Sequence, residues 1–172
     1  GALILGGPGF YAPLAFYNDH AVSEGIGSQA AALLVGVVGA SSVVARLIIS
    51  ALGDRFIPMR QYRLGQLLLL GCLFLWLSAG NSYGLFFLSA LFHGVGWAVW
   101  FTAAPNVLAT WFGVADLGGA LGTFYTALGF GALAGHAVLG FVIDSSGYET
   151  AIALVIGTSI VAWLVCFFPD RL

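Results

Sequence analysis

The sequence predicts an all-α membrane protein with six transmembrane helices, and three observations lead to this fold class. Hydrophobic residues make up 60% of the 172 residues and charged residues only 7%, whereas a soluble domain carries about 25% charged residues. The mean hydropathy is +1.02. The apolar residues fall into six runs separated by short polar segments, and each run approaches the roughly 20 residues with which a helix crosses a bilayer.

The same composition excludes other classes of protein. Nucleic-acid binding requires a basic surface, but the net charge is −2, and disorder requires low hydrophobicity. Short loops between six spans leave no room for a second domain, so residues 1–172 are expected to form one membrane unit. Cys72 and Cys166 stand in apolar runs without metal-ligand spacing, which indicates buried thiols. The sequence predicts neither a metal nor a cofactor.

The beginning of the chain indicates a piece of a longer protein. Gly1 opens the chain inside an apolar stretch, and the only methionine is Met59. The basic segment that precedes the apolar part of a signal peptide is not found before this stretch. We therefore expect further sequence to precede the chain.

Three helices are predicted in the first half of the chain. The first covers residues 1–17 and ends at the polar segment 18–28. The second covers residues 29–51 and ends at a basic loop. The third covers residues 62–79 and ends at Gly80-Asn81-Ser82, whose residue types favour a turn.

Three further helices are predicted in the second half. The fourth covers residues 84–108 and ends at a short loop that contains Gly113. The fifth covers residues 118–143 and the sixth covers residues 149–168. The segment 144–148, with the sequence Asp-Ser-Ser-Gly-Tyr, is typical of a turn.

Two pairs of glycines on the fifth predicted helix have the spacing that brings helix backbones close together in lipid. These pairs are Gly118/Gly122 and Gly131/Gly135. We expect both pairs to lie at helix–helix contacts.

The charges of the loops predict how the helices are oriented. The basic loop residues follow the second and sixth helices, which an even number of helices places on the same side as both termini: Arg55, Arg60, Arg63 and Arg171. The opposite loops contain acidic residues and no Lys or Arg: Asp19, Glu24, Asp144 and Glu149. Because positive loops stay inside, both termini are expected in the cytoplasm, with the helices in a plasma membrane or a bacterial inner membrane.

Arg46 lies well inside the second predicted helix, where a charge costs about 2.5–3.5 kcal/mol. The predicted helix interiors contain no Asp or Glu, and Asp54 follows eight residues later, roughly 12 Å along the axis. Arg46 is therefore expected to face a polar cavity and to bind a ligand carboxylate through two parallel hydrogen bonds. An ion pair with the rest of the protein, or extension of the side chain to the membrane surface, are the alternatives.

Other polar residues in the predicted helices are weaker candidates for the same site. Ser42 lies one turn before Arg46 on the same face, where it would bind substrate or donate to its own helix. His93 and His136 are candidate proton sites within the membrane, and a packing role is the alternative for each.

Aromatic residues on the first and fourth predicted helices would shape the cavity. His93, Trp97 and Phe101 follow one another at a spacing of four residues, and Trp100 lies alongside. Tyr11 would project its hydroxyl group into the cavity, and Asn106 follows Pro105, which frees a backbone carbonyl or kinks the helix. Ordinary packing between helices is the alternative for the aromatic stripe.

The chain resembles the C-terminal six-helix half of a major facilitator superfamily transporter, and within it the monocarboxylate transporter family and its bacterial relatives. The resemblance covers essentially all 172 residues. It is carried by Tyr11-Ala12-Pro13-Leu14, Ala32-Leu33-Leu34, Val44-Ala45-Arg46, Gly53-Asp54-Arg55 with Arg60, the segment 135–140, and Asp144-Ser145-Ser146-Gly147-Tyr148.

This resemblance implies half of a twelve-helix fold whose N-terminal half is absent, and secondary active symport of protons with small monocarboxylates such as lactate by alternating access. Arg46 matches the family's carboxylate-binding arginine, and Tyr11 matches an aromatic cavity position. Ser42 stands where many members carry an acidic residue implicated in proton coupling. Asp54, Arg55 and Arg60 match the cytoplasmic loop motif.

The expected partners are a small organic anion, protons, the lipid bilayer and the missing half, and no catalytic residue is predicted. A carrier for another organic anion or a drug is the main alternative. An intramembrane serine protease is a remote one, because Gly39-Ala40-Ser41 resembles part of a protease motif. Ser42 occupies the position where that motif requires glycine.

Overall fold

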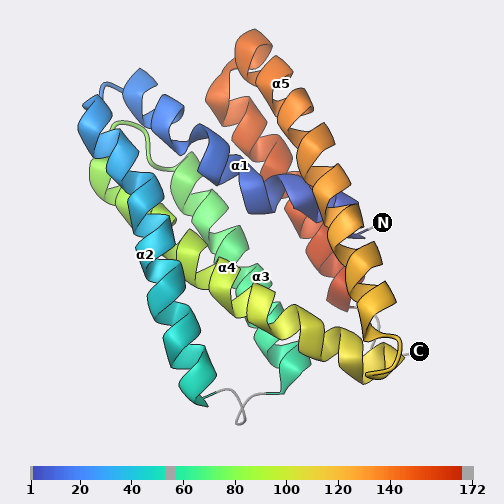
Figure 1. The fold of residues 1–172 in the computed structure, drawn as a ribbon. Coiled ribbons are helices and arrows are strands. Elements are labelled where there is room, and N and C mark those ends of the chain that lie inside the picture. The colour runs from blue at the N-terminus through green and yellow to red at the C-terminus, as the bar shows by residue number, and fades with distance from the viewer. Residues whose placement is uncertain (1, 53–56, 168–172) are drawn as a thin grey trace.

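The computed structural model describes residues 2–52 and 57–167 and is all-α over these residues, as predicted (Figure 1). Asp54 and Arg55 lie outside the described residues. The described part of the chain forms five helices: α1 (Ala2–Ser23), α2 (Ser28–Leu52), α3 (Pro58–Leu77), α4 (Tyr83–Phe112) and α5 (Leu117–Phe167).

The fifth and sixth predicted helices form a single element, so the predicted number of six separate helices is not confirmed. α5 contains 51 residues, and Gly147 within it has non-helical angles, φ 84° and ψ 172°. Glycine adopts a positive φ without steric cost, so one residue replaces the expected five-residue turn. The chain reverses there (Figure 1), and we call residues 117–146 the first arm of α5 and residues 148–167 the second arm.

Three helices of the described residues are long and apolar enough to cross a membrane, over Ser28–Leu52, Tyr83–Phe112 and Leu117–Val165. The third of these would measure about 75 Å if it were straight, more than twice the roughly 30 Å hydrocarbon core. With the reversal at Gly147, the first arm is about 45 Å long and the second about 30 Å, so each arm is long enough for one crossing.

Two helices extend beyond their predicted ends for identifiable reasons. α1 was expected to end at residue 17, but it continues to Ser23. The added turn is stabilised because His20 is buried and contacts Trp76 of α3 and Tyr148 of α5. α4 continues to Phe112 and ends at Gly113, which has a φ of 78° and donates its N–H to the carbonyl of Ala109. A positive φ is accessible to glycine, so Gly113 closes the helix.

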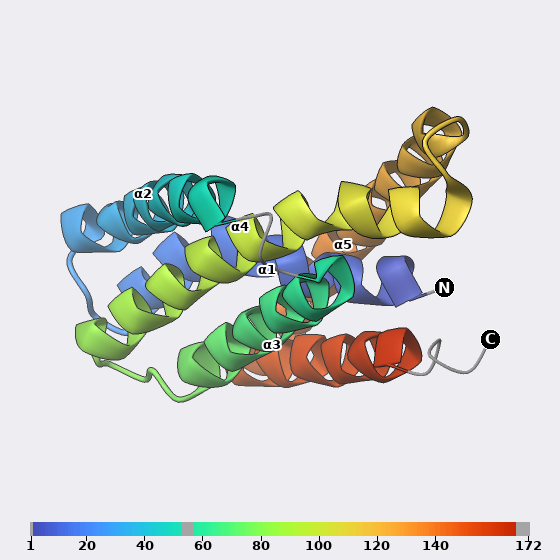
Figure 2. The ribbon, with the colours of Figure 1, turned by 90° about the horizontal axis from the view of Figure 1, so that it is seen from below.

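α1 lies between the two arms of α5 (Figure 2). On the first arm, a Cβ atom added to Gly7 would stand 2.7 Å from backbone atoms of Gly131 and Ala132, and Pro8 packs against Gly135. On the second arm, Gly9 faces Ser159. The expected contact at Gly131/Gly135 is therefore confirmed.

The other glycine pair does not behave as predicted. A Cβ atom added to Gly118 or to Gly122 would meet no atom of the described residues within 4 Å. The spacing of glycines alone does not say which stretch of a helix has a neighbour, and α1 reaches the first arm further along, at Gly131 and Gly135.

A buried polar chain connects α1, α3 and α4. Tyr17 Oη lies 2.7 Å from Ser89 Oγ, and Ser89 Oγ donates to the carbonyl of Cys72 at 2.7 Å. Because the hydroxyl proton of Ser89 is used in that bond, Tyr17 donates to Ser89. Cys72 is a buried free thiol, as predicted, whereas the side chain of Cys166 is outside the description.

The acidic loop residues gather at one end of the bundle, around His20. Trp76 Nε1 donates to His20 Nδ1 at 2.9 Å, His20 Nε2 lies 3.6 Å from Glu24 Oε1, and the His20 ring stacks on Tyr148 with centroids 4.4 Å apart. Burial lowers the pKa of His20, against the opposing effect of Glu24 and Glu149. This favours the neutral imidazole, whose Nδ1 accepts the Trp76 bond. The side of the membrane that this end faces stays a prediction.

The contact between α1 and the first arm can be tested by adding one methyl group. Gly7→Ala should destabilise the full-length protein by about 1–3 kcal/mol, because the new methyl group meets backbone that cannot move aside. Gly122→Ala is the matched control and should be neutral or stabilising by up to about 1 kcal/mol, since alanine favours helix and the site is open. Unfolding in detergent measures both; equal midpoints for the two variants would contradict this packing.

Candidate functional site

α2 and α4 touch at Gly94, and this contact organises the candidate site. A Cβ atom added to Gly94 would stand 3.1 Å from the backbone nitrogen of Ser42 and would collide with Ser41 Oγ and the carbonyl of Val38. Beyond the contact the two helices spread apart toward Leu52 and Phe112 (Figure 1). The line along which α2 and α4 face each other divides the surface of the pair into two sides.

One side of the α2–α4 pair is an apolar groove of about 570 Å³. Its polar member, Ser41, donates its hydroxyl to the carbonyl of Val38 at 3.1 Å. That bond gives the side chain of Ser41 a local structural role, and no histidine lines the groove. The groove is lined by Val37, Ala40, Ser41, Val44, Ala45, Ile48, Ile49, Phe87, Leu91, Val95 and Val99.

Arg46 and Ser42 lie on the opposite side of the pair. Successive residues of an α-helix are turned by about 100° about its axis. Relative to the face of α2 that meets Gly94, this rotation places Ser42 and Arg46 on one side and the groove-lining residues on the other. On α4 the same geometry turns Trp97 and Phe101 away from the groove. We call this the Arg46 side of the pair, and helix geometry places Arg46, Ser42, Trp97 and Phe101 on it.

The Arg46 side chain is exposed. Within residues 2–52 and 57–167 it has no hydrogen bond and no ion pair. The exposed side chains near it on α2 are mainly apolar, including Val43 at 59% and Leu47 at 68% exposure. The described helices therefore leave a guanidinium available to an anion within an apolar segment.

A row of aromatic rings connects α1, α4 and α5. The rings of Trp97 and Phe101 stack with centroids 5.1 Å apart, and Phe101 stacks on Tyr125 at 5.5 Å. Tyr11 meets Trp97 edge-on at 4.9 Å. We call Tyr11, Trp97, Phe101 and Tyr125 the aromatic wall, and all four side chains are partly buried.

The sequence analysis missed Tyr125. Its signal was the aromatic pair Phe124-Tyr125 in the fifth predicted helix, but the pairing of this helix with α4 could not be read from the spacing. Phe124 is buried, and Tyr125 completes the wall.

Two predicted cavity residues do not face the Arg46 side. Trp100 is fully buried and packs on Phe10 at 4.2 Å and on Phe124 at 5.4 Å, so it supports the wall from behind. Asn106 is exposed, and its position on α4 turns it toward the groove side. The carbonyl of Asn106 accepts a hydrogen bond from Thr110 Oγ1 at 2.8 Å.

The two candidate proton sites have different surroundings. His93 is fully buried, its Nδ1 lies 3.6 Å from Cys72 Sγ, and its ring stacks on Trp97 at 5.8 Å. His136 is partly buried, and its Nδ1 donates to the carbonyl of Ala132 at 2.6 Å. His93 therefore touches the wall, whereas His136 is bonded to its own helix.

The predicted loop motif lies only partly within the described residues. Arg60 is exposed in the first turn of α3, whereas Asp54 and Arg55 lie outside the described residues. Among the residues that the structure describes, no group of three or more His, Cys, Asp or Glu side chains could hold a metal ion.

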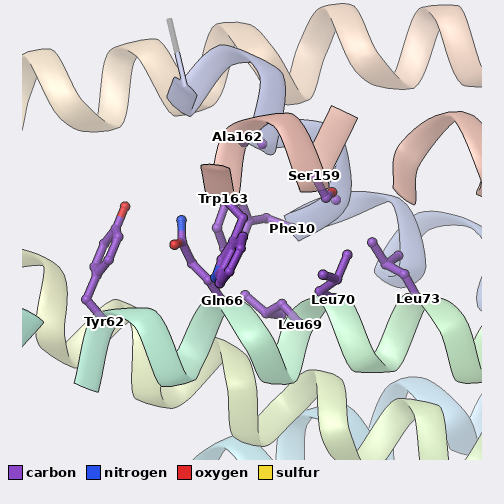
Figure 3. Close-up of a pocket in the computed structure, with 11 residues that line it drawn as sticks. Phe10, Tyr62, Gln66, Leu69, Leu70, Leu73, Ser159, Ala162 and Trp163 are labelled. Carbon is purple, nitrogen blue, oxygen red and sulfur yellow. The ribbon is translucent and has the colours of Figure 1, made fainter. Parts of the chain in front are cut away.

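A small cavity lies between α1, α3 and the second arm of α5. In Figure 3 the side chains of Tyr62 and Gln66 point from α3 toward the second arm, which carries Ser159 and Trp163. Its volume is about 30 Å³, enough for a water molecule and far below the roughly 300 Å³ of a small-molecule site. This cavity is therefore not the candidate substrate site.

The sequence profile of the Major Facilitator Superfamily matches residues 2–172. No curated protein sequence matches the chain. The match covers all of the described helices and does not distinguish the monocarboxylate transporters from other branches of the superfamily.

The division of α2 into a polar and an apolar side predicts different reactivity for two engineered cysteines. In a cysteine-free background of the full-length protein, Ser42→Cys should react with a membrane-impermeant thiosulfonate, because the Arg46 side would be hydrated. Val44→Cys, which lies two residues later in the apolar groove, should stay unlabelled. Equal labelling of the two would contradict the division.

Proposed function

The chain belongs to the Major Facilitator Superfamily, and on that premise we propose that it is half of a secondary transporter for small monocarboxylates. Members of this superfamily are transporters rather than enzymes. The proposed reaction is transport of an anion together with a proton across the membrane by alternating access. The single observation that carries the choice of an anion is Arg46.

Arg46 supports this choice because its charge is unmatched by the described residues. A charge within an apolar helix persists where it lines a polar path or has a partner. The planar guanidinium binds a carboxylate through two parallel hydrogen bonds, which an ammonium group cannot reproduce. In the proposal, Arg46 holds the substrate carboxylate while Ser42, one turn away, donates a further hydrogen bond.

The exposed apolar side chains support the presence of a second half. Leu33 on α2 is 62% exposed, and Phe130, Leu133 and Phe141 on the first arm of α5 are 64%, 72% and 75% exposed. These side chains require lipid or protein as a neighbour. In the proposal, the second half packs beside α2 and the first arm, and the substrate binds between the halves near the middle of the bilayer, as in other transporters built from repeats.

The group that carries the coupled proton is proposed separately from the anion site. Ser42 cannot titrate at physiological pH, so it cannot replace the acidic residue that related carriers use. His93 is the candidate within this chain, because its ring stacks on Trp97 of the aromatic wall. A group in the second half would be the other source of coupling.

The role of Arg46 can be tested by measuring uptake of labelled lactate by the full-length protein. Arg46→Ala should raise the KM by roughly 10- to 100-fold, the equivalent of losing about 1.5–3 kcal/mol of charge-assisted hydrogen bonding. Arg46→Lys should also be impaired. The control is Leu47→Ala, which removes an exposed neighbour and should leave uptake unchanged. Wild-type kinetics for Arg46→Ala would overturn the assignment.

A carboxylate introduced at position 42 should make uptake depend on pH. In Ser42→Asp, the new side chain lies one turn from Arg46 and would pair with it, so the KM should rise at pH 7. Arg46 lowers the pKa of a neighbouring carboxyl group, so uptake should recover only as the pH falls far enough to protonate it. Ser42→Asn is the neutral control, and the same pH profile in both variants would contradict the predicted neighbourhood.

A further inference from the structure

The geometry points to a substrate class for this site: monocarboxylates that carry an aromatic ring, such as arylalkanoates, in preference to aliphatic acids of the same size. This inference rests on the proposed function, because it takes Arg46 as the carboxylate site. It adds the aromatic wall as the determinant of specificity for the rest of the molecule.

The rings of the wall form a nearly parallel row. The planes of His93 and Trp97 differ by 28°, those of Trp97 and Phe101 by 18°, and those of Phe101 and Tyr125 by 20°. Trp97 has His93 and Phe101 as stacked neighbours, and Phe101 has Trp97 and Tyr125, so we infer that these two rings offer their edges to a ligand. Ring edges are electropositive and ring faces electronegative. A ligand ring that lays its face against this row therefore gains an attraction that a saturated ring does not.

The row is also held in place before a ligand arrives. Trp97 is fixed edge-on by Tyr11 at an angle of 83°, and Phe101 is backed by the fully buried Trp100 at 5.4 Å. Trp100 itself stacks on Phe124 at 5.4 Å. A surface that is already ordered costs little conformational entropy on binding, so the attraction of the ring edges contributes to affinity.

Two phenol groups provide polar contacts at the wall. Tyr11 meets Trp97 edge-on and Tyr125 stacks on Phe101, and within the described ranges neither phenol hydroxyl group has a hydrogen bond. A hydroxyl group can both donate and accept, so the pair suits a polar substituent on the side chain or ring of the ligand.

A single ligand is proposed to contact both Arg46 and the wall. Arg46 and Trp97 lie on the same side of the α2–α4 pair, while the groove side offers only apolar side chains and one serine that is bonded to its own helix. An arylalkanoate would place its carboxylate on Arg46 and its ring on the wall. Lactate would use only the first of these two contacts.

The test compares two acids with the same carbon skeleton, one with an aromatic ring and one with a saturated ring. In proteoliposomes that contain the full-length protein, uptake of labelled phenylacetate is measured against competition by unlabelled phenylacetate and cyclohexylacetate. An aromatic pair contributes about 0.5–1.5 kcal/mol beyond the area that it buries, so phenylacetate should compete about 2- to 12-fold better. Equal competition, or stronger competition by cyclohexylacetate, would overturn the inference.

Variants of the wall localise the preference. Trp97→Leu and Phe101→Leu should abolish the advantage of phenylacetate over cyclohexylacetate while both acids remain substrates. The matched control is Phe87→Leu, because Phe87 is an aromatic residue of α4 that lines the groove, and this variant should keep the full preference. Should a wall variant not reach the membrane, the comparison of the two acids on the unmodified protein decides the question.

The same assay separates the inference from the function on which it rests. Uptake that requires Arg46 but shows no preference for the aromatic acid would overturn the inference alone. Uptake of both acids at the wild-type rate by Arg46→Ala would overturn the proposed function. No uptake of either acid by the unmodified protein would overturn both.

Discussion

The close contact of α2 with α4 at Gly94 is the constraint on which the candidate site depends. A side chain at position 94 would collide with Ser41 and with the backbone of α2, so the absence of one allows the two helices to touch. The contact sets the rotation of both helices. It turns the apolar residues of each toward one groove, and it turns Arg46 and Trp97 toward the other side. Arg46 and Trp97 thus share a side of the pair because of Gly94, which is part of neither the charge nor the wall.

The aromatic wall and the core are parts of one packing arrangement. Trp100 lies between Phe10, Tyr62 and Phe124, and it reaches α3 at Gly65, where a Cβ atom would stand 2.6 Å from its backbone nitrogen. The partly buried rings of Trp97, Phe101 and Tyr125 continue this cluster toward the Arg46 side. A rigid core behind a partly exposed row is the arrangement that a specific binding surface requires.

Much of the fold could be predicted from the sequence, because apolar runs and polar segments mark helices in a membrane protein. The location of Arg46 inside an apolar helix could also be predicted, because it is a charged residue within a run of apolar residues. The break in α5 was expected near residue 147, but five turn-forming residues gave no indication that Gly147 alone would break the helix. Tyr125, Trp100 and Asn106 required knowledge of which helices are neighbours and how each is rotated. A sequence pattern does not contain that information, and the unpacked pair Gly118/Gly122 shows the same limit.

The place of α1 between the two arms of α5 has a consequence for motion. Gly7 meets the first arm backbone to backbone, and Gly9 faces the side chain of Ser159 on the second arm, so glycines bring α1 close to both arms. Tilting of α1 toward one arm would displace that arm, so movements of the three segments would be coupled. α2 buries four of its 25 residues, and its close backbone contact is with α4, at Gly94. Movement of α2, the helix that carries the guanidinium, would therefore be coupled to movement of α4.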